Sequence, residues 1–141
     1  MNTVTRLSIS VALALGLSAC AEQTPEEARQ DAAEDVAETR QDARQTQAEA
    51  REEVREAADD GPDDMRDATA DAVDDTAEAR YDVEIAEIEG RHEIAVAECA
   101  MIEDEAEEDA CEARAEAEHD TAVADAERRL EEAEARANRM E

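Results

Sequence analysis

The chain offers very few large apolar side chains from which a compact core could be built. Of its 141 residues 42% are hydrophobic, but 33 of these are Ala, Phe and Trp are absent, and Tyr81 is the single aromatic residue. Burial has to offset about 1–2 kcal/mol of backbone entropy for each ordered residue. Alanine buries little surface, but it has the highest helix propensity. The composition therefore predicts an all-α fold of extended helices with little compact core.

The charge balance excludes several classes of function. The chain holds 43 acidic residues against 14 basic ones, all of them Arg, and its formal net charge is −29. Nucleic-acid binders and basic membrane-surface helices both need clustered cations, so we expect neither. The few Ser residues lie in the first twenty positions, and no pairing of a nucleophile with a base is visible. We therefore expect no enzymatic activity and no cofactor.

The first twenty residues predict where the protein is sent. A short, weakly positive start is followed by the apolar stretch Leu7–Leu17, which is too short for a bilayer span of about 20 residues. This pattern is typical of a secretory signal. Its ending, Leu17-Ser18-Ala19-Cys20, resembles the lipobox of bacterial lipoproteins. That resemblance implies a signal peptide over 1–19 and a lipid-bearing Cys20 at the mature N-terminus. An ordinary signal peptide with an incidental cysteine is the alternative.

Residues 20–60 form an acidic, Ala-rich segment without Gly. Thr24 and Pro25 suit the N-cap and first position of a helix. A seam of small residues with a seven-residue period favours helix, but it offers little burial per turn; it consists of Val36, Ala43, Ala50 and Ala57. The segment is either a helix or a flexible tether between the membrane and a distal domain.

The sequence Asp59-Asp60-Gly61-Pro62 is the clearest break in the chain. Gly suits the position after a helix, and Pro suits the first turn of the next one. The surrounding Asp residues do not have the ligand spacing of an EF-hand calcium loop. We therefore expect a helix junction here, followed by a helical hairpin or coiled coil over 61–141, with helices at about 63–102 and 107–140.

Two apolar stripes with alternating spacings of three and four predict that these last two helices face each other. The first stripe contains most of the large apolar residues of the chain, and the second is mostly Ala. The first is Tyr81, Ile85, Ile88, His92, Ala95, Cys99 and Ile102, and the second is Val123, Ala126, Leu130, Ala133, Ala137 and Met140. We regard Tyr81, Ile85, Ile88, Ala95 and Ile102 as a candidate interaction face for a partner helix.

Two cysteines remain once Cys20 carries lipid, and the oxidising periplasm favours a disulfide between them. Cys99 and Cys111 are twelve positions apart. In one continuous helix they would be about 18 Å apart along the axis, whereas a disulfide needs Cα atoms within about 7 Å. The bond therefore requires a turn within residues 103–108, which contain neither Gly nor Pro, and Asp104 is a candidate cap for the following helix. Free thiols would instead favour a long coiled coil.

Two weaker resemblances concern the rest of the chain. The segments Tyr81–Ala86 and Glu108–Ala115, with Cys99 between them, resemble a set of uncharacterised Ala-rich proteobacterial lipoproteins with a two-cysteine helical hairpin. That resemblance implies no activity. The segment Ala133–Met140 is similar to murein-type outer-membrane lipoproteins, which attach to peptidoglycan through a terminal Lys. This chain has no Lys, so that linkage is chemically excluded.

His92 and His119 are the candidate metal ligands of the chain. Together with Cys99 and Cys111 they suggest a zinc site, but four such residues on regular helices cannot reach one ion. In a hairpin closed by the disulfide, the two histidines would instead face each other. They would then form a two-histidine metal site or a pH-sensitive contact, with ordinary interface or solvated histidines as the alternative. We expect the many Asp and Glu residues to be solvated helix faces.

These features predict a lipoprotein anchored in the outer membrane and facing the periplasm. Ala21 follows the lipidated position, where an Asp would favour retention in the inner membrane under the enteric sorting rule. The expected role is structural or partner-docking, with the lipidated N-terminus in the membrane and a helical protein or a second copy as partner. The alternative is a polyanionic protein that binds divalent cations.

Overall fold

The structure is a computed structural model that describes residues 23–140 of the chain. The expected signal peptide over 1–19 and the expected lipidation site Cys20 lie outside the described residues. None of the helices in the described part is long and apolar enough to cross a membrane.

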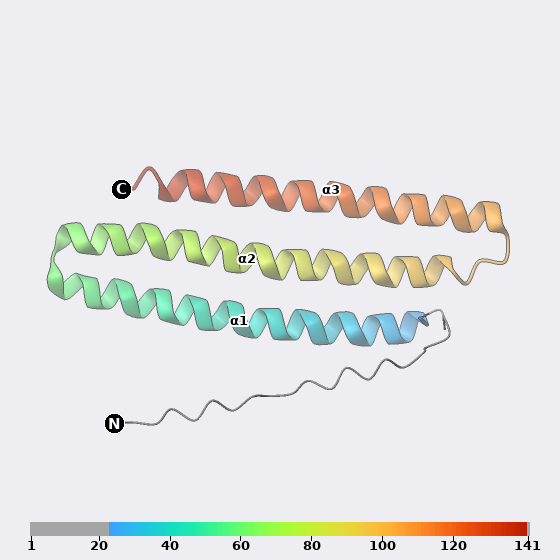
Figure 1. The fold of residues 1–141 in the computed structure, drawn as a ribbon, viewed down its shortest axis with the longest axis horizontal. Helices are drawn as coiled ribbons and strands as arrows, with labels where there is room; N and C mark the ends of the chain where they lie inside the picture. The colour runs from blue at the N-terminus through green and yellow to red at the C-terminus, as the bar shows by residue number, and fades with distance from the viewer. Residues whose placement is uncertain (1–22, 141) are drawn as a thin grey trace, which may run out of the picture.

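The described residues form three long helices that run antiparallel in a single layer (Figure 1). They are α1 (Pro25–Asp60), α2 (Pro62–Cys99) and α3 (Glu105–Ala137). The central helix α2 packs against both neighbours, and within residues 23–140 α1 and α3 do not contact each other. The all-α prediction and the C-terminal hairpin are confirmed, and the ends of α2 and α3 lie within three residues of the expected ones.

The start of α1 is fixed by a capping box. Thr24 accepts a hydrogen bond from the backbone N–H of Glu27, and the Glu27 carboxylate accepts from the backbone N–H and hydroxyl of Thr24. Pro25 occupies the first helical position, where its missing N–H is not needed. The hydrogen bond from the Thr24 backbone, followed by that from its hydroxyl, lowers the pKa of Glu27. The predicted start of the helix is therefore correct.

The junction between α1 and α2 is a single residue. Gly61 has φ +156° and ψ 173°, a region of backbone conformation that is open essentially only to glycine. Its N–H donates to the carbonyl of Ala57, and Pro62 begins α2 at once. This reversal turns the chain back on itself, and α1 therefore lies along α2.

The packing of α1 along α2 bears on the two alternatives for the expected 20–60 segment, a helix or a flexible tether. From Pro25 onward it is a helix, so the flexible-tether alternative is wrong for residues 25–60. In the predicted heptad seam, Ala43 and Ala50 are buried, and Val36 and Ala57 are half-buried. Alanine also supplies half of the buried residues of α2 and all of those of α3. The buried hydrophobic residues are Ala28, Ala32, Ala43, Ala50, Ala70, Ala79, Ile88, Ala97, Cys99, Ala115, Ala126 and Ala137.

The turn between α2 and α3 occupies residues 100–104, slightly earlier than expected. A disulfide joins Cys99 to Cys111, with their Cα atoms 5.6 Å apart. Asp104 caps α3, because its side chain accepts hydrogen bonds from the backbone N–H groups of Ala106 and Glu107. The cap and the disulfide therefore fix a reversal that no Gly or Pro marks.

Candidate functional site

Three residues of the predicted interaction stripe, Tyr81, Ile88 and Ala95, lie against α3 of the same chain. Ile88 is 2% exposed, and Tyr81, Ile85, Ala95 and Ile102 are half-buried. Ala115 and Ala122 of α3 line a cavity with Ile88 and Ala95, and Ala126 and Leu130 line a groove with Tyr81. For Tyr81, Ile88 and Ala95, α3 of the same chain therefore lies where we expected a partner helix.

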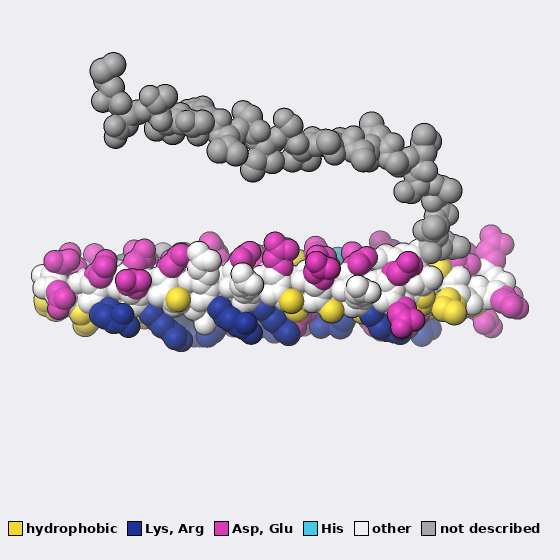
Figure 2. All heavy atoms as spheres, turned by 90° about the horizontal axis from the view of Figure 1, so that it is seen from below, with side chains coloured by type: hydrophobic (Ala, Val, Ile, Leu, Met, Phe, Trp, Pro, Cys, Tyr) yellow, Lys and Arg dark blue, Asp and Glu magenta, His cyan; other side chains and the backbone are white. Residues whose placement is uncertain are grey.

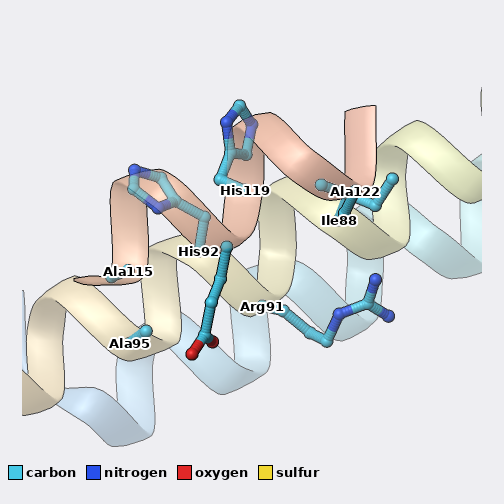
Figure 3. A pocket seen from close by; sticks show the side chains of 8 residues that line it. Ile88, Arg91, His92, Ala95, Ala115, His119 and Ala122 are labelled. Carbon is cyan, nitrogen blue, oxygen red and sulfur yellow. The ribbon is translucent and has the colours of Figure 1, made fainter. Parts of the chain in front are cut away.

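The two histidines meet across the α2–α3 interface, as the hairpin predicted. His92 lies on α2, seven residues before Cys99, and His119 lies on α3, eight residues after Cys111. Their ring centroids are 4.8 Å apart, and the ring planes are tilted by 45°. Figure 3 shows both rings on the same side of the helix pair, while Arg91 points away from them. The disulfide fixes the register that brings them together.

The nitrogens of the two rings differ in their surroundings. Nδ1 of His92 is buried and has no hydrogen-bond partner among residues 23–140. Nδ1 of His119 lies 3.4 Å from Oδ1 of Asp120. Both rings line a cavity of about 90 Å³, whose other walls are Ile88, Arg91, Ala95, Ala115, Glu118 and Ala122. Each ring thus retains a nitrogen that forms no hydrogen bond with the described residues.

The arginines gather on one face of the layer. In α1 they recur at spacings of eleven, four, seven and four, which places them on one side of the helix; they are Arg29, Arg40, Arg44, Arg51 and Arg55. Figure 2 shows the layer edge-on with α1 in front, and Arg side chains follow its lower side while Asp and Glu follow the upper side. The arginines and most carboxylates of α1 are therefore on opposite faces.

Ion pairs between helices extend this arrangement across the whole layer. Arg40 of α1 contacts Glu87 of α2 with an N–O distance of 2.6 Å, and Arg29 pairs with Glu98. Arg129 of α3 contacts Glu84 of α2 at 2.7 Å. Arg80 lines two grooves on the same side. One groove is also lined by Arg51 of α1, and the other is also lined by Arg129 and Arg136 of α3. We call the surface formed by Arg29, Arg40, Arg44, Arg51, Arg80, Arg91, Arg129 and Arg136 the Arg face.

The opposite side of the layer is lined by carboxylates. A groove between α1 and α2 is walled by acidic side chains and small residues; its acidic residues are Asp35, Glu38, Asp42, Glu89 and Glu93. Glu93 also lines a neighbouring groove with His92, Glu108 and Glu112. We call these seven carboxylates the acidic face, and the histidine pair lies at its edge. The carboxylates of the acidic face repel one another. On the Arg face, by contrast, Arg29, Arg40 and Arg129 are paired with glutamates.

Our sequence reasoning missed this separation of charge. The signal was available in α1, because the Arg spacings fit one helix face and the acids fall between them.

The described residues contain no group of three or more His, Cys, Asp or Glu placed to hold one metal ion. Comparison of the chain with protein-family models, curated proteins and solved structures finds no significant match in any of the three. The function therefore has to be argued from these residues.

Proposed function

We propose that this protein is an outer-membrane lipoprotein whose three-helix layer serves as a docking platform in the periplasm. The lipobox-like sequence ending at Cys20 supports the anchor. The observation that carries the docking role is the separation of charge across a thin layer. The acidic face has its five groove carboxylates gathered between two rigid helices, so it suits a basic, helical protein surface.

Metabolic labelling with an alkyne-bearing palmitate tests the anchor. The wild-type protein should carry the label, begin at Cys20 after processing, and fractionate with outer membranes. Cys20→Ser should lose the label, and it leaves the Cys99–Cys111 disulfide intact. A mature N-terminus at another residue would overturn the lipoprotein proposal.

Site-specific photocrosslinking in living bacteria tests the docking role. A crosslinking residue at Glu38 on the acidic face should capture one defined protein, and the same residue at Arg44 on the Arg face should not. The captured protein, once purified, should bind wild type and lose affinity when Asp35, Glu38 and Asp42 become amides.

A matched variant controls for overall charge in that binding experiment. Glu34→Gln, Glu52→Gln and Asp59→Asn remove the same charge from exposed positions on α1 outside the acidic groove. This variant should keep the affinity of the wild type. Equal losses in both variants would indicate a nonspecific effect of charge and would contradict a docking site on the acidic face.

The acidic groove also supports the second candidate function, which is cation binding. Because five carboxylates line it without forming a compact ligand cluster, bound Ca²⁺ would be held diffusely. Calcium should then raise the melting temperature more than NaCl of equal ionic strength does. Equal effects of the two salts would exclude this candidate.

A further inference from the structure

We propose that His92 and His119 form a two-histidine site for a divalent transition-metal ion such as Zn²⁺. This inference does not depend on the docking role. The two rings come from antiparallel helices, and the disulfide about two helical turns away holds those helices in register. Ligands that are already positioned lose less freedom on binding, which favours a site at this point.

The distance between the rings fits one shared ion. Imidazole nitrogens bind Zn²⁺ at about 2.0–2.1 Å in a tetrahedral arrangement, which places the centroids of two ligating rings about 5 Å apart. The observed centroid separation is 4.8 Å. At this separation, rotation about the side-chain bonds would aim one nitrogen of each ring at a common ion, and water would complete the coordination.

The surroundings of the nitrogens favour a metal as their missing partner. Asp120 lies beside Nδ1 of His119, and a carboxylate in that position holds the proton there and leaves Nε2 as the ligand. Nδ1 of His92 is buried without a hydrogen-bond partner in the described part of the chain. A metal ion would use the lone pair of that ring.

The carboxylates near the histidine pair favour binding of a cation, and the imidazole ligands determine which class of metal ion binds. Glu93, Glu108 and Glu112 line the groove next to His92, and they attract cations to this end of the acidic face. Arg91 lines the histidine cavity, but its side chain points away from the two rings (Figure 3). Imidazole prefers Zn²⁺, Cu²⁺ and Ni²⁺, whereas Mg²⁺ and Ca²⁺ prefer oxygen ligands. The site should therefore discriminate between these two classes.

Zinc titration of the mature, disulfide-bonded chain in excess MgCl₂ tests the proposal, because Mg²⁺ occupies the carboxylates. Wild type should bind one Zn²⁺ per chain under these conditions. His92→Gln and His119→Gln should each weaken zinc binding by about tenfold or more. Asp120→Asn alters only a positioning residue and should weaken zinc binding by about tenfold. Glu38→Gln with Asp42→Asn removes carboxylates remote from the histidines and should change nothing.

Two results would overturn the site. The first is zinc binding of equal strength in wild type and both histidine variants, which would assign the ion to carboxylates. The second is the absence of magnesium-resistant binding in wild type. If a histidine variant loses its helicity, NMR of the imidazole groups in the wild type replaces the comparison. One equivalent of Zn²⁺ should shift the NMR signals of both imidazole rings, and unshifted signals would refute the proposal.

Discussion

A Cβ atom built on Gly90 would lie 2.6 Å from the Cβ of Ala32, closer than two such atoms can approach. Gly90 is buried inside α2, nine residues before the end of the helix, and Ala32 is buried on α1. The missing side chain therefore lets the two helices approach closely. A glycine inside a helix costs about 1 kcal/mol relative to alanine, and the close helix contact explains its presence here.

Gly90→Ala should destabilise the protein although it raises helix propensity. We expect a net loss of about 1–3 kcal/mol in the free energy of unfolding, because α1 has to move away from α2. Urea denaturation followed by circular dichroism measures this loss. Adding Ala32→Gly to Gly90→Ala should restore part of the stability, and a stabilising effect of Gly90→Ala alone would contradict the close contact.

The disulfide should stabilise the α2–α3 hairpin mainly by restricting the unfolded chain. For the twelve-residue separation of Cys99 and Cys111, the chain-entropy treatment gives about 3 kcal/mol. The variant Cys99→Ser/Cys111→Ser should lose that amount in urea denaturation, and a reducing agent should have the same effect on wild type. The double variant itself should not respond to the reducing agent. Unchanged stability in both experiments would show that the link is not formed in solution.

Removal of the α3 cap should destabilise the turn that no Gly or Pro marks. Asp104→Ala leaves the N–H groups of Ala106 and Glu107 without their acceptor, at a cost of about 1 kcal/mol. Asp109→Ala removes the same charge from an exposed position further along α3 and is the matched control. In thermal unfolding, Asp104→Ala should have a lower melting temperature than Asp109→Ala. Equal melting temperatures would argue against a stabilising cap.

The capping box of α1 should weaken in acid. Hydrogen bonds from Thr24 lower the pKa of Glu27 in the folded protein. The stabilisation is therefore fully present above the pKa of the unfolded chain, and it is lost as pH falls through the lower folded value. Hydrogen exchange of the first turn of α1 should accelerate over that range in wild type. Glu27→Gln controls for the general protonation of carboxylates and should lack this response.

Added salt should stabilise the protein rather than weaken it. NaCl screens the exposed pairs Arg40–Glu87 and Arg129–Glu84, which contribute at most about 1 kcal/mol each. It also screens the mutual repulsion of carboxylates in a chain with a net charge of −29. We expect the repulsion to dominate, so the melting temperature should rise with NaCl. A falling melting temperature would indicate that the ion pairs between helices dominate.

Local chemistry made much of the fold predictable. Thr24 and Pro25 mark the start of a helix and Gly61-Pro62 marks a break, because each acts through backbone geometry within a few residues. The spacing of Cys99 and Cys111 requires a turn, since a helix separates them too far for a bond. From that turn it followed that His92 and His119 face each other, which is the basis of the proposed metal site.

The sequence alone predicted the all-α fold, the ends of α2 and α3 to within three residues, and the hairpin that a Cys99–Cys111 disulfide requires, whereas the tertiary structure decided how the three helices combine. An alanine stripe has the same pattern whether its helix packs or stands alone, so the docking of α1 on α2 stayed open until Gly90 and Ala32 were seen in contact. Periodicity places Arg40 on one side of its own helix, but it does not say which helix lies beside it. Only lateral packing joins the arginines of three helices into the Arg face and leaves the carboxylates opposite.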